Sequence, residues 1–258
     1  MQRAYKNRRL IYFQGVSDAD HWDRVWKLHE TQSLYEAAER GDLGYYEDIF
    51  LKHLPREGKI LEAGCGLGQI VIALRARGFE VEGVDYATQT IQELQRRFPQ
   101  NPFRVGDVTK LEAPDGFYSG YISLGVMEHL EDGPNLFLKE ARRVLKKGGI
   151  ACISVPYLNF LRRLKAALGF YRGEENKLPF YQYAYSSLEF SQILKLAGFE
   201  IVATYQYSGY KGTKDELPFL MEIFKWPQGW RLQKALMNSK WLDRHNGHMM
   251  MYIARRRN

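Results

Sequence analysis

The chain has 258 residues, 45% of them apolar, which suits one α/β domain with insertions. Lys and Arg outnumber Asp and Glu by 37 to 30, and the resulting net charge of +7 permits an anionic partner without requiring one. The two cysteines, Cys65 and Cys152, exclude a disulfide framework and a cysteine-rich metal site. The apolar run at 10–13 is too short for a signal peptide and no later run resembles a membrane span, so we expect a cytoplasmic protein.

In chain order, the pattern predicts one domain with four parts. Residues 1–55 are expected to form a helical cap rich in aromatic side chains (Trp22, Trp26 and His29 among them), and 56–156 a cofactor-binding core. Residues 157–185 are expected to form a lid insertion without strands. Residues 186–258 then complete the sheet around a second, irregular insertion at 208–246.

Within the core, apolar runs alternate with helical stripes. The expected strands are 59–64, 80–86, 103–105, 118–125 and 150–155, and the expected helices are 68–77, 88–98 and 133–145. Such alternation predicts a parallel sheet with helices on both faces. After the lid we expect a helix at 186–197, capped by Ser186 with Glu189 three residues on, and strands at 200–207 and 248–254.

The stretch KILEAGCGLG at 59–68 is a strand that runs into three glycines, Gly64, Gly66 and Gly68. A strand, a glycine turn and a helix are typical of nucleotide-binding α/β domains, with the ligand at the carboxyl end of the strand. Dinucleotide sites use G-x-G-x-x-G to cradle a pyrophosphate. Here the spacing is G-x-G-x-G with Glu62 before it, and a carboxylate in this place suits a cation better than a pyrophosphate.

Two further acids follow the next two strands. Asp85 ends the second strand and can accept both hydroxyls of a ribose; its structural alternative is to cap the next helix, a role that Thr88 fills better. Asp107 can accept a hydrogen bond from an adenine amine while the Val108 amide donates to a ring nitrogen, or it is an ordinary loop aspartate. Because the carboxyl ends of neighbouring parallel strands converge, the three acids predict an adenosine-binding crevice.

With these residues in place, the chain resembles the class I S-adenosylmethionine-dependent methyltransferases, in particular the small-molecule group that includes the ubiquinone-biosynthesis O-methyltransferases. The resemblance covers about 45–156 and 186–207, and its carriers are LEAGCGLG at 61–68, GVDYA at 83–87, VGDVTKL at 105–111, SLGVMEHLED at 123–132, RVLKKGGIACISVP at 143–156 and SSLEFSQILKLAGFEIV at 186–202. It implies a doubly wound, seven-stranded, mostly parallel sheet whose last strand is antiparallel.

The resemblance also implies S-adenosylmethionine as the cofactor and S-adenosylhomocysteine as its product. The glycine loop would wrap the methionine part, Glu62 would position it, Asp85 would hold the ribose, Asp107 would bind adenine, and the backbone of Leu124 and Gly125 would contact the ammonium. The full set of expected cofactor residues is Glu62, Gly64, Cys65, Gly66, Gly68, Asp85, Tyr86, Asp107, Val108, Leu124, Gly125 and His129. No metal is expected.

His129 is the candidate general base, because histidine titrates near neutrality and the residue follows the fourth strand. The alternative is that Glu128-His129 packs over the cofactor or fixes a helix start. For the acceptor pocket we expect Tyr157, Tyr181 and Tyr183, although core filling explains alternating tyrosines equally well.

In the lid, residues 158–170 place Leu161, Leu164 and Leu168 on one helical face, with Arg162 and Lys165 elsewhere. This pattern is compatible with an anionic or lipid-like acceptor and with peripheral membrane contact, or with a plain surface helix. We therefore expect methyl transfer to a small-molecule or lipid-like acceptor by a monomer or homodimer. The alternatives are a nucleic-acid methyltransferase, disfavoured because no Asn-Pro-Pro-Tyr-type motif follows the fourth strand, and a protein of this fold that only binds cofactor.

Overall fold

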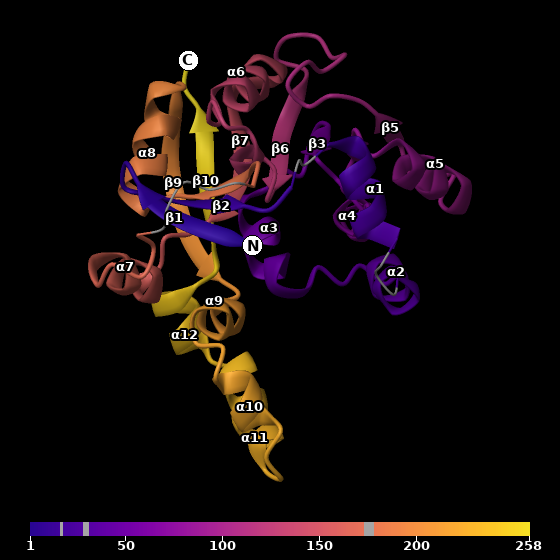
Figure 1. Cartoon of the computed structure of the whole chain (residues 1–258). Helices are drawn as coiled ribbons and strands as arrows, with labels where there is room; N and C mark the ends of the chain where they lie inside the picture. Colours follow the sequence, from indigo (N-terminus) through magenta and orange to yellow (C-terminus); the bar gives the residue numbers. More distant parts are fainter. Residues whose placement is uncertain (16–17, 28–30, 173–177) are drawn as a thin grey trace.

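The computed structural model describes residues 1–15, 18–27, 31–172 and 178–258. Within these residues, seven strands form the main sheet in the order β5-β4-β3-β6-β7-β10-β9 (Figure 1). Their bounds are β3 Ile60–Ala63, β4 Val81–Asp85, β5 Phe103–Val105, β6 Tyr118–Leu124, β7 Leu145–Pro156, β9 Phe199–Tyr207 and β10 Met249–Arg256. The pairs among β3 to β7 are parallel, and β10 runs antiparallel to both β7 and β9. The expected seven-stranded fold is confirmed.

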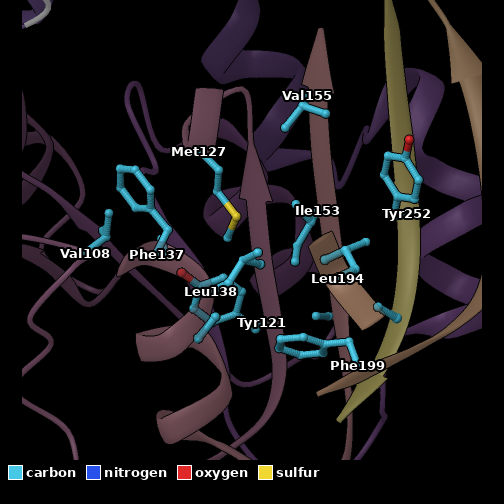
Figure 2. Close-up of a cluster of buried hydrophobic side chains, with 14 of the residues drawn as sticks. Val108, Tyr121, Met127, Phe137, Leu138, Ile153, Val155, Leu194, Phe199 and Tyr252 are labelled. Carbon is cyan, nitrogen blue, oxygen red and sulfur yellow. The ribbon is translucent and has the colours of Figure 1, made fainter. Parts of the chain in front are cut away.

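Side chains alternate between the two faces of the sheet because successive residues of a strand point to opposite sides. On β10, Met250 and Tyr252 belong to the core on one face, whereas Met251 and Ile253 belong to the core on the other. The first of these cores is drawn in Figure 2, where the side chains of β6, β7 and β10 meet those of the helices that cover them. Both faces of the sheet are therefore buried.

Helices supply the remaining walls of the two cores. Their bounds in the core region are α3 Glu47–His53, α4 Gln69–Ala76, α5 Thr88–Arg97, α6 Asn135–Val144 and α8 Ser187–Leu196. Ser186 caps α8 as expected, its Oγ accepting a hydrogen bond from the Glu189 amide at 3.2 Å. The Glu189 carboxylate does not complete the capping box; it pairs instead with Arg9 of the N-terminal strand β2 (Arg9–Phe13).

The first 13 residues were expected in a helical cap, and that prediction is wrong for them. They form a hairpin of β1 (Gln2–Lys6) and β2 (Arg9–Phe13), turning at Asn7 and Arg8, which both have positive φ, as a two-residue hairpin turn requires. Strand β2 also pairs with β8 (Phe180–Ala184), inside the lid that was expected to lack strands. A three-stranded sheet thus joins the N-terminus to the lid. The helices α1 (Ala19–Lys27) and α2 (Gln32–Glu39) follow, and His29 lies outside the described residues.

Helix α5 is not capped by Thr88, whose hydroxyl donates to the Tyr86 carbonyl. Asp23 of α1 takes this role: its carboxylate accepts from the amides of Gln89 (3.2 Å) and Thr90 (2.8 Å). Because the cap comes from another helix, it also fixes α1 over the carboxyl end of the sheet.

The insertion at 208–246 was expected to be irregular and is helical. It contains α9 (Gly209–Glu216), α10 (Leu220–Phe224), α11 (Gly229–Met237) and α12 (Lys240–Asn246). Gly209 and Gly212 lie where α9 and α12 meet, and a Cβ on either would fall 2.2 Å from the backbone of α12. Only glycine permits this approach. Figure 1 shows α10 and α11 extending away from both sheets.

The lid helix α7 (Phe160–Ala167) buries the basic side of the predicted amphipathic pattern and exposes much of its leucine side. Arg162 is 1% exposed and pairs with Glu216 of α9, as does Lys165, while Leu164 and Leu168 face solvent. Burial acts to raise the pKa of Glu216, but the Tyr171 hydroxyl and the surrounding cations hold that pKa below its ordinary value. The basic side chains of α7 are thus partly structural.

No helix among the described residues is both long enough and apolar enough to cross a membrane.

Candidate functional site

The glycine loop connects β3 to α4 in a conformation that other residues rarely adopt. Gly64, Gly66 and Gly68 have φ values of +80°, +48° and +70°. A Cβ on Gly64 would lie 2.4 Å from a Val126 methyl, and one on Gly66 would lie 2.9 Å from the Trp26 ring. Sterics therefore require glycine at both positions, and the loop lies directly under α1.

The acids of β3 and β4 are buried beside this loop. Asp85 accepts hydrogen bonds from the amides of Gly66 (2.8 Å) and Ala87 (2.9 Å), which orient its carboxylate. Glu62 is 3% exposed, and its Oε2 has no hydrogen-bond partner. Burial raises the pKa of Glu62 well above its ordinary value, and the Asp85 charge raises it further. Two buried acids side by side create a strong preference for a cationic ligand.

Asp107 follows β5 at the edge of the same region. Its Oδ1 accepts from the amide (2.8 Å) and hydroxyl (2.7 Å) of Thr109, which fixes the turn. Val108 is buried next to it, and Tyr86 follows Asp85.

A cavity of about 690 Å³ brings most of the expected cofactor residues together. Its lining includes Glu62, Gly64, Cys65, Gly66, Asp85, Tyr86, Asp107, Val108, Leu124, Gly125 and His129. Gly68 is not in the lining; it is the N-cap residue directly before α4. Burial raises the pKa of Cys65 well above its ordinary value, which makes this thiol a packing group rather than a nucleophile.

Aromatic side chains from α1 and β8 cover the cavity. Trp22 and Trp26 stack with ring centroids 5.5 Å apart, Trp22 meets His129 edge-on at 5.1 Å, and His129 meets Tyr181 at 5.0 Å. Trp22 and Trp26 were expected in the cap but not in the site, although their spacing of four residues on a helix places them on one face.

Glu128 and His129 form a buried pair at the end of β6. The Nδ1 of His129 is 2.9 Å from the Tyr181 carbonyl, which can only accept, so Nδ1 carries the proton and Nε2 keeps a lone pair. Burial lowers the pKa of His129 to about 4 and raises that of Glu128 to about 8. The Glu128 carboxyl reaches within 3.9 Å of Nε2, and its Oε2 has no hydrogen-bond partner. At neutral pH the Glu128 carboxyl is therefore protonated and the His129 ring is neutral.

The far end of the cavity is built by residues that the sequence did not single out. Lys211, Asp215 and His248 line it on the β7–β10 side of the sheet, whereas Asp107 follows β5 at the other edge, and Gln182 of β8 also lines the cavity. His248 Nδ1 accepts from the Arg162 guanidinium at 2.8 Å, and its Nε2 lies 3.3 Å from the Lys211 ammonium, which can only donate. Burial, with the charges of Arg162 and Lys211, lowers the pKa of His248 to about 2, so this ring stays neutral and does not act as a base.

The three tyrosines expected in the acceptor pocket are divided by the structure. Tyr181 lines the cavity, whereas Tyr157 and Tyr183 belong to the buried core, where Tyr183 donates its hydroxyl to the Glu131 carbonyl at 2.9 Å. Only Tyr181 is thus placed to meet a ligand.

The residues present fit S-adenosylmethionine. Glu62 and Glu128 offer carboxyl oxygens without partners to a ligand that carries a sulfonium and an ammonium, and both line the cavity together with the glycine loop. Among the described residues, no group of three or more His, Cys, Asp or Glu side chains is placed to hold a metal.

Comparison with known proteins supports the same assignment. The family described as "Methyltransferase domain" matches residues 40–204. A probable S-adenosylmethionine-dependent methyltransferase of Mycolicibacterium smegmatis is 31% identical over 146 residues, covering 56% of this chain and 53% of that protein. A ubiquinone biosynthesis O-methyltransferase of Azorhizobium caulinodans is 27% identical over 149 residues, covering 53% of this chain and 57% of that protein.

Solved structures extend the likeness of the fold over nearly the whole chain. Geranyl diphosphate C-methyltransferase from Streptomyces coelicolor, solved with Mg²⁺, geranyl diphosphate and S-adenosyl-L-homocysteine, superposes with a TM-score of 0.57 at 15% identity, over 92% of this chain and 98% of that one. The matches span only about half the length of the curated relatives. With the family match, the sheet order and the three acids in agreement, the chain belongs to the methyltransferase-domain family of class I S-adenosylmethionine-dependent methyltransferases.

Proposed function

We propose that the protein transfers the methyl group of S-adenosylmethionine to a small-molecule or lipid-like acceptor. The observation that carries the proposal is the continuity of the cavity. It runs from Glu62 and Asp85 past Glu128 and His129 to the end lined by Lys211 and His248, beyond the residues expected to hold the cofactor. That end is where an acceptor would lie.

When bound, S-adenosylmethionine supplies an activated methyl group, so the protein's main work is alignment and exclusion of water. The Trp22–Trp26 stack and Tyr181 close the cavity over the reacting centre. The Lys211 ammonium, which lies 3.3 Å from His248 Nε2, offers hydrogen bonds to a polar or anionic group of the acceptor. These contacts would fix its nucleophilic atom relative to the cofactor.

If the nucleophile carries a proton, His129 Nε2 is the atom that we propose accepts it. The Tyr181 carbonyl holds the ring in the correct tautomer, and an ionised Glu128 at 3.9 Å would stabilise the imidazolium. A His129→Ala variant should then lose turnover far more than cofactor affinity. Equal loss of both would assign His129 to binding or packing.

The test of the proposed reaction is a methyl-transfer assay with S-adenosylmethionine labelled on its methyl group, supplied with fractionated extract of the source cells. We expect label in a small-molecule or lipid fraction, identified by mass spectrometry as a product heavier by one methyl group. Label confined to nucleic acid or protein would contradict the proposed acceptor class. Tight cofactor binding without any transfer would identify a binding protein of this fold.

A further inference from the structure

The helices α10 and α11, with the residues that connect them to α9 and α12 and the first two residues of α12, form an aromatic projection, residues 217–241. Figure 1 shows this segment extending from the body of the molecule. None of its residues belongs to the three buried hydrophobic cores of the described chain. The projection is thus held by few apolar contacts with the rest of the protein.

Large apolar side chains on the projection face solvent instead of a core. Trp226, Trp230 and Trp241 are 67%, 56% and 65% exposed. The other exposed apolar side chains there are Phe219, Met221, Leu232 and Met237. Clusters of this kind on a surface mark sites that bind a partner or a membrane.

Basic residues are mixed with these aromatic side chains. The exposed ones within or next to the projection are Lys225, Arg231, Lys234, Lys240 and Arg244. Among the nearby acids, Glu222 is already paired with Lys225, and Asp243 accepts a hydrogen bond from the Gly209 amide. The five basic residues still exceed the two acids of residues 217–244 by three, so the surface around the tryptophans carries a net positive charge.

Helix α11 carries this mixture on one face. Trp230 and Met237 are seven residues apart and Lys234 lies between them, so all three project from the same side of the helix. The Arg231 guanidinium lies 5.5 Å from the Trp230 ring centroid. Tryptophan together with Lys and Arg is the composition of segments that lie in the headgroup layer of membranes.

We propose that the aromatic projection docks on the surface of an anionic lipid bilayer. Charge favours a bilayer over a second copy of this chain, because a symmetric contact would bring the same cations face to face. Helix α11 packs against α9, whose Lys211 and Asp215 line the far end of the cavity. The docked protein would therefore present the acceptor end of its cavity near the bilayer, and the docking itself does not depend on the proposed reaction.

Vesicle flotation of the intact protein tests the proposal. We expect binding to phosphatidylcholine vesicles that contain phosphatidylglycerol at low salt, weaker binding at high salt, and little binding to phosphatidylcholine alone. Three of the five tryptophans lie in the projection, so bound protein should show blue-shifted emission and quenching by brominated lipids. Absence of flotation at low salt would overturn the proposal.

Matched variants locate the contact. Arg231→Gln with Lys234→Gln should weaken partitioning about 30-fold, since each basic residue near an anionic surface contributes about a factor of five. The exposed pair Lys146 and Lys147 lies outside the projection, and its double glutamine variant should change binding by much less than the first pair. If both double variants lost vesicle binding equally, the effect would depend only on the net charge of the protein, which would contradict a specific docking site.

The tryptophans need a separate pair of variants. Replacing Trp226, Trp230 and Trp241 by alanine should abolish flotation and leave circular dichroism and cofactor affinity unchanged. Replacing the exposed Phe117, Leu188 and Leu196 by alanine is the control and should leave flotation intact. A dimer in solution that the tryptophan variant dissociates, without vesicle binding by the parent protein, would assign the surface to a second copy instead.

Discussion

Replacing Glu62 by glutamine tests whether the buried acids are there to hold a cation. Glu62 is 3% exposed, its Oε2 lacks a partner, and burial and the Asp85 charge raise its pKa well above the ordinary value. A bound ammonium or sulfonium would favour the ionised form, so cofactor binding should release a proton and become tighter as the pH rises. Glutamine matches the shape of the protonated acid but cannot supply the charge.

The size of the effect follows from the contact that is lost. A hydrogen bond to a charged group contributes about 1.5–3 kcal/mol, which corresponds to cofactor binding about 10- to 150-fold weaker in Glu62→Gln. Stability without cofactor should move in the opposite direction. A carboxyl whose folded-state pKa is raised contributes stability that is fully present below the unfolded pKa of about 4.3 and is lost as the pH rises through the folded pKa. Glu62→Gln does not lose stability in this way, so without cofactor its free energy of unfolding should exceed that of the parent protein by an amount that grows with pH.

Calorimetric titration with S-adenosylhomocysteine, run in phosphate and in Tris, measures both affinity and the protons released. Thermal unfolding without ligand from pH 5 to pH 8 measures the stability difference. The exposed Glu80, which reaches Lys59 at 3.8 Å, supplies the control variant Glu80→Gln, and it should change neither measurement appreciably. A Glu62→Gln protein that binds cofactor as tightly as the parent, or that is less stable without ligand at pH 8, would refute the reasoning.

Three further predictions follow from single contacts. Gly64→Ala should cost about 2–4 kcal/mol of unfolding free energy, because its Cβ would overlap Val126. The control Gly78→Ala, also at positive φ (+82°) but with open space around it, should cost only about 1 kcal/mol. Equal losses of the two variants in urea unfolding would show that backbone strain alone matters. Glu216→Gln should lower the free energy of unfolding by about 3–5 kcal/mol at pH 7, because it leaves the buried Arg162 without its carboxylate. The stabilising effect of Glu216 should fade as the pH falls through its lowered pKa. An unchanged melting temperature of the variant would contradict this prediction. Turnover of a protonated acceptor should rise as the pH passes about 8, because Glu128 ionises there. If a Glu128→Gln variant keeps this rise, the rise comes from the ionisation of another group.

The sequence predicted the main sheet and most of the cofactor site because both depend on local patterns. Apolar runs that end in Glu62, Asp85 and Asp107 mark the carboxyl ends of strands, and the parallel sheet then brings those ends together. Gly64 and Gly66 were recognisable because a tight turn beside a ligand requires glycine. The expectation for each of these residues in cofactor binding stays a prediction until a ligand is measured.

The rest of the site depends on contacts between residues far apart in the sequence. Strand β2 is five residues long and pairs with β8, whose first residue comes more than 160 positions later, so its short apolar run gave no sign of a sheet. Arg162 was assigned to an exposed helical face because its partner Glu216, 54 residues on, is invisible to helical periodicity. Besides the spacing of Trp22 and Trp26, an overlooked local signal is in residues 208–213, where Gly209 and Gly212 stand three apart and permit the close packing of α9 and α12.

Binding of S-adenosylhomocysteine tests the central claim most directly. Isothermal titration calorimetry at pH 7 should show one ligand per chain with proton release, a marked loss of affinity in Asp85→Ala, and no heat with NAD. Binding of NAD without binding of S-adenosylhomocysteine would contradict the account.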